Sequence, residues 1–150
     1  MPAEDSRPQL PRRGPAPPVD RMDNAELARL VEAEHPYRGK ALFELSDRIA
    51  VDDDAATKVA MLSRLTSLRT ARLFDRVSLA WSAIIALLAA ETPHSRSSAY
   101  EAFYALGEAE QRDMLDYLEV TAIEDAHPRI GSMARTPGSP RRRVILRPRP

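Results

Sequence analysis

Arginines near the C-terminal end are the residues of this chain whose chemistry is easiest to interpret. Four of them surround the apolar residues 144–146, and they are Arg141, Arg142, Arg143 and Arg147. Because arginine neutralises phosphates and releases their counterions, the segment predicts contact with an anionic surface, including weak nucleic-acid binding without sequence preference. The apolar residues are also compatible with strand addition to a partner or with a lipid headgroup layer. The alternative is a tail whose arginines carry no function.

A second basic group is expected on the helix predicted for residues 55–90. Four cations fall within an arc of about 60° when each residue advances the helix by ~100°, and they are Lys58, Arg69, Arg72 and Arg76. Asp75 is the only acidic residue in that run. The stripe is interpreted either as a solvated face or as a surface that binds phosphate or an acidic partner.

The last predicted helix, from residue 108 to about residue 125, has the reverse charge. Its acidic face is formed by Asp113, Asp116, Glu119 and Glu124. This face is either solvated or receives a basic partner, for which the C-terminal tail is the nearest candidate. The helix–glycine–helix outline of residues 98–118 does not indicate DNA recognition, because the acids of its second helix would repel phosphates.

Catalytic and metal-binding patterns are weak. The histidines, His35, His94 and His127, each lie beside a proline at an expected helix end, where an imidazole can bind backbone carbonyls. The chain has no cysteine, and it contains no glycine-rich phosphate loop or nucleophile elbow. We therefore assign no catalytic residue, no metal site and no cofactor.

One short pattern suggests a different chemistry. Arg29 and His35 are separated by five residues. This spacing resembles the Arg-x(4–6)-His motif of the HEPN-type all-helical ribonucleases. The resemblance covers seven residues, and it implies that the pair lies at a dimer cleft, contacts phosphate and assists attack by the ribose hydroxyl. An enzyme of this type is the remote alternative to a non-enzymatic protein.

Proline and charge divide the chain in the same places. The formal net charge is zero, yet acids outnumber cations in residues 23–127, while residues 128–150 contain arginines and no acid. Most of the 13 prolines lie in residues 1–22 and 128–150. Because proline lacks an amide donor and breaks helices, we predict a disordered Pro-rich segment at 1–22, an all-helical domain at 23–127 and a disordered basic tail at 128–150.

The central region predicts a compact all-α bundle of five or six helices, without strands. Asp23 and Glu26 predict a capping box, and residues 52–54 place acids at another helix start. Gly39 is expected to separate the first two helices, and Ser98 to open a later one. An unbroken helix over residues 55–90 would be about 54 Å long, whereas a domain of this size is roughly 33 Å across. We therefore predict a break near Thr66, Ser67 and Thr70.

Residues 77–90 are the most apolar stretch. A membrane span needs about 20 apolar residues, so this stretch predicts a buried core helix that contains Trp81. It suits the centre of a monomer or a dimer seam, with a homodimer slightly favoured. Residues 1–22 lack the apolar run of a secretory leader, and we expect a soluble, cytoplasmic protein with no integral membrane segment.

Three functions remain as hypotheses. The first is a small non-enzymatic interaction or regulatory protein, whose acidic bundle docks an unknown protein partner while the Arg-rich tail contacts an anionic surface. The second is a nucleic-acid-associated protein that binds through the tail and the stripe of Lys58, Arg69, Arg72 and Arg76. The third is the ribonuclease suggested by Arg29 and His35.

Overall fold

The computed structural model describes residues 15–129, and that part of the chain is mostly helical. It contains seven α-helices, three short 3-10 helices and one pair of strands. In chain order the elements are η1 (Val19–Arg21), α1 (Asn24–Glu32), α2 (Arg38–Arg48), η2 (Ile49–Val51), α3 (Asp53–Leu62), α4 (Thr66–Arg69), β1 (Arg72–Phe74), β2 (Val77–Ser78), α5 (Leu79–Ala90), α6 (Pro93–Tyr104), α7 (Glu108–Leu118) and η3 (Ile123–Asp125). The predicted all-α bundle is confirmed.

Side-chain caps begin several of these helices, as the sequence indicates. The Glu26 N–H donates to Asp23 Oδ1 at 2.8 Å and the Asp23 N–H to Glu26 Oε1 at 2.9 Å, which is the predicted capping box of α1. Asp52 caps α3 in a similar way. The box that opens α6 is formed by Thr92 and Ser95, so this helix begins earlier than the predicted start at Ser98.

The chain interrupts its helices between α3 and α5, as predicted, but over a longer stretch. After Leu62 the backbone makes tight turns and the short helix α4, and an antiparallel hairpin of β1 and β2 follows. The expectation of no strands was wrong here. Strands of three and two residues are too short for their alternation to be recognised in a sequence.

Two other helix boundaries also differ from the prediction. Gly39 lies inside α2 rather than before it, and the separation from α1 falls at residues 33–37. Helix α7 ends at Leu118, where Glu119 adopts the left-handed conformation with φ of 61°. The predicted helix from residue 108 to residue 125 is therefore divided into α7 and η3.

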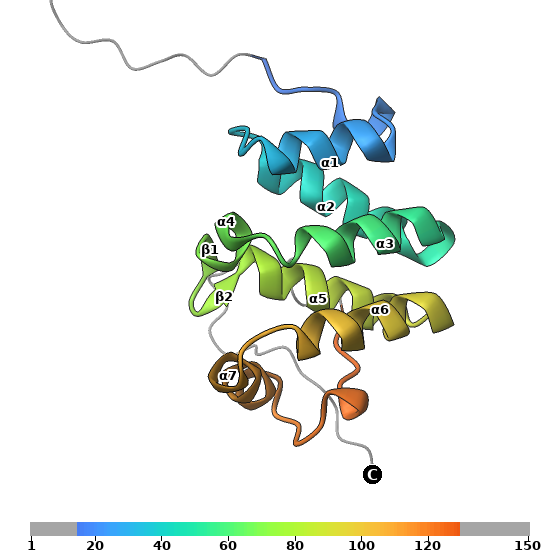
Figure 1. The fold of residues 1–150 in the computed structure, drawn as a ribbon. Helices are drawn as coiled ribbons and strands as arrows, with labels where there is room; N and C mark the ends of the chain where they lie inside the picture. The colour runs from blue at the N-terminus through green and yellow to red at the C-terminus, as the bar shows by residue number, and fades with distance from the viewer. Residues whose placement is uncertain (1–14, 130–150) are drawn as a thin grey trace, which may run out of the picture.

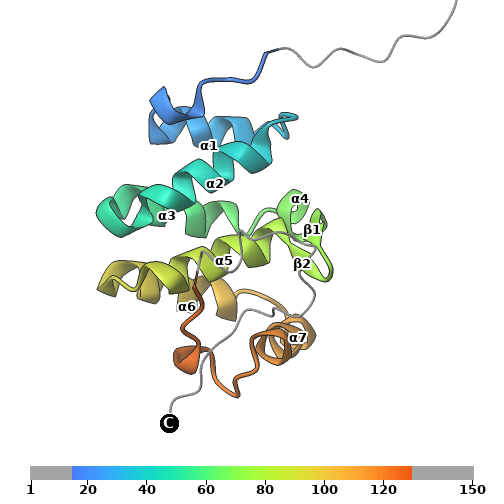
Figure 2. The same ribbon diagram turned by 180° about the vertical axis from the view of Figure 1, so that it is seen from behind.

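Helix α5 lies at the centre of the packing. Residues 79–88 are all buried, which fits a helix that is apolar on every side, and α5 contacts α2, α3, α4 and α6. Figure 1 shows α1, α2, α3, α5, α6 and α7 stacked in this order, and the reverse view in Figure 2 shows the same sequence of layers. The buried core helix predicted for residues 77–90 is confirmed. Among the described residues, no helix is both long and apolar enough to cross a membrane.

The packed region extends beyond the boundary expected at residue 23. Val19 is buried in the same core as α5, and its carbonyl accepts from Arg48 Nη2 at 3.2 Å. Towards the end of the described region, Ala126 belongs to the same core, and Pro128 is buried as well. The apolar core thus spans nearly the whole described region.

Candidate functional site

The predicted basic stripe does not exist as one helical face. Lys58 lies on α3 and pairs with Asp54 of the same helix at 3.0 Å. The other three cations belong to later elements, because the chain leaves the helical path after Leu62: Arg69 ends α4, Arg72 begins β1 and Arg76 lies in the turn between the strands. The stripe was wrong as a helical pattern, yet the turns of the chain bring its three arginines together.

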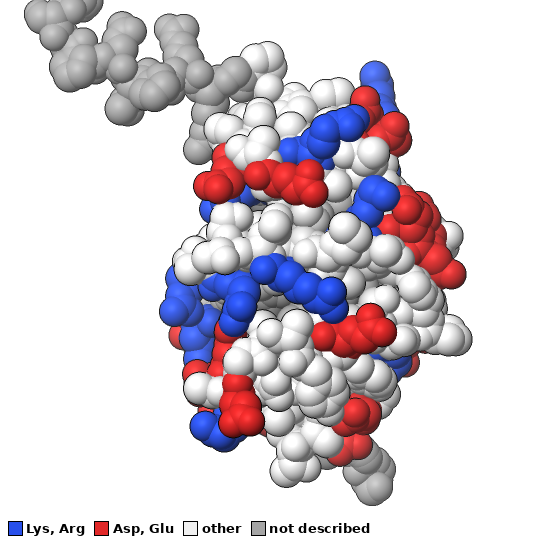
Figure 3. Space-filling model, in the orientation of Figure 1, with Lys and Arg blue, Asp and Glu red and all other residues white. Residues whose placement is uncertain are grey.

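These arginines surround a small pocket between the hairpin, the start of α5 and α7. The pocket has a volume of about 280 Å³ and is lined by Arg69, Arg72, Arg76, Ser78, Trp81, Glu110 and Asp113. Basic side chains gather over α4 and the hairpin in Figure 3, with acidic side chains close by. We call this the arginine pocket.

Glu110 already engages two donors of the arginine pocket. Its Oε1 accepts from Arg69 Nη2 at 2.6 Å, and its Oε2 accepts from Trp81 Nε1 at 2.9 Å. Trp81 is only 4% exposed, so its indole N–H requires a partner within the fold. One carboxylate therefore satisfies an arginine and a buried indole together.

The two remaining arginines are held differently. Arg76 Nη2 pairs with Asp116 of α7 at 3.0 Å, and its guanidinium carbon lies 5.6 Å from the centre of the Tyr117 ring. Arg72 Nη1 donates to the Arg76 carbonyl at 3.1 Å, and this is its single hydrogen bond within the described residues. Arg72 is exposed, and most of its five N–H donors bind no acceptor among residues 15–129.

Ser78 forms the inner wall of the arginine pocket. It caps α5 by accepting the N–H of Trp81 at 3.0 Å, and it is 3% exposed. Its hydroxyl proton has no acceptor among the described residues, so the hydroxyl can donate to a group in the pocket it lines.

The predicted acidic face is divided between two elements. Asp116 on α7 receives Arg76, whereas Glu124 lies in η3 and accepts from the Tyr104 hydroxyl at 3.2 Å. Glu110 and Asp116 show that α7 is paired with the hairpin region of the same chain. The tail arginines Arg141, Arg142, Arg143 and Arg147 lie outside the described residues.

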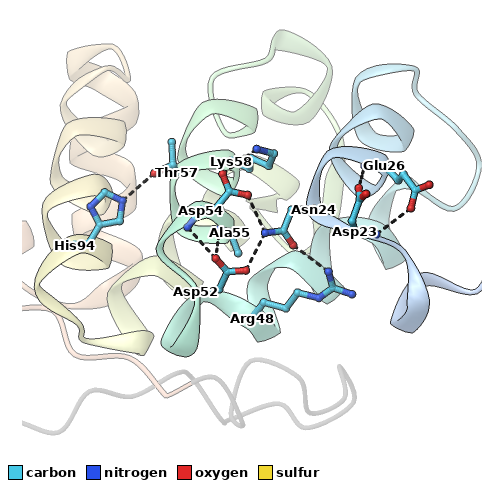
Figure 4. A network of polar contacts seen from close by, with 10 residues as sticks. All are labelled: Asp23, Asn24, Glu26, Arg48, Asp52, Asp54, Ala55, Thr57, Lys58 and His94. Atoms are coloured by element: carbon cyan, nitrogen blue, oxygen red, sulfur yellow. Dashed lines mark hydrogen bonds and ion pairs between the residues drawn. The ribbon is translucent and has the colours of Figure 1, made fainter.

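A separate polar network joins the ends of the first three helices (Figure 4). Asn24 Nδ2 donates to Asp52 Oδ2 and to Asp54 Oδ2, each at 2.9 Å, and Arg48 Nη1 donates to Asn24 Oδ1 at 2.9 Å. The hydrogen bond from Asn24 lowers the pKa of Asp52, and the Asn24 and Lys58 side chains lower the pKa of Asp54. Every charge in this network has a partner, which indicates a structural role.

The histidines occupy three separate places. His35 Nδ1 accepts the N–H of Tyr37 at 3.0 Å, His94 Nε2 contacts Thr57 Oγ1 at 2.8 Å, and His127 Nδ1 contacts Glu91 Oε2 at 2.9 Å. Within residues 15–129, no three His, Cys, Asp or Glu side chains group together in a way that could hold a metal ion.

Arg29 and His35, the pair that resembles the ribonuclease motif, lie on and just beyond α1. Arg29 is exposed on α1, and His35 follows the end of that helix. The ring nitrogen Nδ1 of His35 is engaged by the backbone of Tyr37 at 3.0 Å. Its use as an acid or base would have to involve the other nitrogen.

Sequence patterns did not identify Ser78, Trp81, Glu110 and Asp113 as parts of this pocket. Trp81 was assigned to the core, which is where it lies, but its N–H also faces an acid on α7. A buried tryptophan needs a hydrogen-bond acceptor, so the search for its partner was the available signal. The partner is 29 residues further along the chain, and spacing alone does not identify it.

Comparisons of the chain with protein-family models, with curated proteins and with solved structures found no match.

Proposed function

We propose that this protein is a non-enzymatic interaction protein that binds an anionic side chain of a protein partner in the arginine pocket. The observation that carries the proposal is the convergence of Arg69, Arg72 and Arg76 on one pocket with Ser78 and Trp81. Arginine clusters recognise phosphorylated and acidic motifs through paired, charge-assisted hydrogen bonds. The donors come from α4, the hairpin and the start of α5.

The size of the pocket favours one functional group over a whole small molecule. Cavities that enclose drug-sized ligands have volumes of about 300–1,000 Å³ and are mostly apolar. The arginine pocket, at about 280 Å³, lies at the lower end of this range, and five of its seven lining residues are charged. A single side chain from a partner fits these properties.

The surrounding charge favours a protein partner over nucleic acid. Glu110 and Asp113 line the pocket, and Asp116 neutralises Arg76. A nucleic acid presents a row of phosphates, which would meet these carboxylates as well as the arginines. A partner that presents one anionic group brings less negative charge to these carboxylates than a nucleic acid does. The alternative is nucleic-acid binding through the tail and the predicted stripe, and the test below includes RNA for this reason.

The test uses fluorescence anisotropy with labelled peptides and the full-length protein. A peptide with one phosphoserine is compared with its glutamate and serine counterparts, and with mixed-sequence RNA. We expect saturable binding of the phosphoserine peptide that weakens at least fivefold in Arg72→Ala, because Arg72 keeps most of its donors free.

Arg112→Ala is the matched control, because Arg112 is exposed on α7 and does not line the pocket. It removes the same charge and should leave peptide affinity within twofold. An equal loss of peptide affinity in both variants would show that only net charge matters, and it would contradict the proposal. Binding of RNA alone would support the nucleic-acid alternative instead.

A further inference from the structure

Glu110 occupies the arginine pocket as an external anion would. Its two carboxylate oxygens accept from two different donors, Arg69 Nη2 at 2.6 Å and Trp81 Nε1 at 2.9 Å. We propose that Glu110 is a built-in competitor, and that a phosphorylated side chain of the partner binds by displacing this carboxylate from Arg69 and Trp81. The competition rests on the proposed function, because it concerns the same pocket and the same partner.

The side chain of Glu110 can leave without the loss of α7. Glu110 lies in the first turn of α7, and its side chain is 25% exposed, so water reaches the ion pair. The helix is anchored elsewhere by Met114 and Leu118, which are fully buried, and by the pair of Arg76 with Asp116. A rotation of one side chain therefore frees both donors.

The donors favour phosphate over a second carboxylate. Arg69 and Trp81 together satisfy the two oxygens of one carboxylate, while Arg72 and the Ser78 hydroxyl have hydrogens that no described residue accepts. A phosphate monoester carries a charge of about −1.5 to −2 and three acceptor oxygens, so it can use these additional donors. A glutamate on the partner would only replace one carboxylate with another.

Competition predicts that removal of the internal carboxylate strengthens binding. In Glu110→Gln the amide retains the shape of the side chain but loses its charge. The apparent affinity of a protein for a ligand equals its intrinsic affinity multiplied by the fraction of molecules whose site is open. We therefore expect the phosphoserine peptide to bind Glu110→Gln on the order of tenfold more tightly than wild type, as measured by isothermal titration calorimetry on the full-length protein.

Asp113→Asn is the matched control for charge. Asp113 lines the same pocket, but its carboxylate makes no hydrogen bond or ion pair with any described residue. Its neutralisation removes one negative charge without freeing a donor. The affinity for the phosphoserine peptide should therefore rise less than about threefold, because only the local electrostatic potential changes. An equal gain of peptide affinity in both variants would indicate that only the local charge matters. It would contradict the proposal that Glu110 competes with the ligand.

The remaining outcomes separate the two proposals. If wild type and Glu110→Gln bind the phosphoserine peptide equally, or if the variant binds less well, Glu110 is not a competitor and the proposed function stands. If neither binds it, the proposed function fails and the competition fails with it. Glu110→Ala, and the thermal unfolding midpoint of each variant, check that the results do not come from a loosened α7.

Discussion

Arg96 shows how one side chain can hold the end of the described region in place. Its guanidinium donates to the Leu88 carbonyl at the end of α5 and to the Ala126 and Glu124 carbonyls, each at 3.2 Å. It also donates to the Tyr100 hydroxyl at 3.0 Å. Four acceptors from three parts of the chain meet at one planar group, which a lysine cannot reproduce.

We predict that Arg96→Ala lowers the free energy of unfolding by about 2 kcal/mol, the range of hydrogen bonds that involve a charged group. Amide exchange should also accelerate at residues 123–126, because their carbonyls lose this anchor. Denaturant unfolding and hydrogen exchange measure the two effects. Unchanged exchange at residues 123–126 would contradict the anchoring role, and Arg96→Lys should recover only part of the stability.

Asn24 couples stability to pH through two carboxylates. Its amide lowers the pKa of Asp52 and of Asp54 below the ordinary value of 3.8. A lowered native pKa contributes stability that is fully present above the ordinary value and is lost as the pH falls through the lowered value. The hydrogen bond from Arg48 to Asn24 involves neither of these carboxylates.

We predict that Asn24→Ala is less stable than wild type at pH 7, and that this difference shrinks when the pH falls below 3.8. Urea unfolding at pH 7 and at low pH gives the two differences. A constant difference across this range would show that the carboxylates are not coupled to Asn24.

At the scale of elements, the hairpin of β1 and β2 positions the arginine pocket. It carries Arg72 at its start and Arg76 in its turn, and β2 leads directly into α5 through Ser78. The turn includes Asp75 with φ of 48°, in the left-handed region that most side chains avoid. Asp and Asn tolerate this conformation better than other residues except glycine.

We predict that Asp75→Val lowers the free energy of unfolding by about 1–2 kcal/mol, the cost of the left-handed conformation for a residue with a branched side chain. Asp75→Gly should be neutral or slightly stabilising, and it serves as the control. Thermal unfolding measures both. Equal destabilisation by valine and glycine would show that the Asp75 side chain, rather than its backbone, matters for the turn.

Local sequence signals predicted the starts of α1 and α3 and the buried helix α5, but neither the start of α6 nor the site. Asp23 with Glu26 and the apolar residues of α5 identified their elements, because capping and burial depend on nearby residues. The regular placement of cations over residues 55–90 suggested one helical stripe, whereas Leu65 starts a new turn without a side-chain cap. Arg69 and Glu110 meet through tertiary packing across 41 residues, which no local pattern reports.

At the scale of the whole molecule, opposite charges pair between distant parts of the chain. Arg69 pairs with Glu110 of α7, and Arg76 pairs with Asp116 of the same helix. Two of the negative charges on α7 are therefore neutralised by arginines of the same chain. The arginine pocket belongs to the described residues, whereas the tail arginines lie outside them. Their contributions can be separated by truncation.

We predict that a chain ending at residue 129 retains the phosphoserine-peptide affinity of the full-length protein within twofold, because the pocket is built from residues 69–113. Any RNA binding by the full-length protein should weaken between about 50 and 200 mM salt and be lost in the truncated chain. Loss of peptide binding in the truncated chain would place the contact in the tail instead.

The most direct test of the central claim is the indole N–H resonance of Trp81 in a ¹⁵N-labelled full-length sample. Trp81 is the only tryptophan of the chain, so its signal reports on the arginine pocket alone. We predict a saturable shift on addition of the phosphoserine peptide, and none with the serine peptide at the same ionic strength. No shift with either peptide, or equal shifts with both, would contradict anion binding at this pocket.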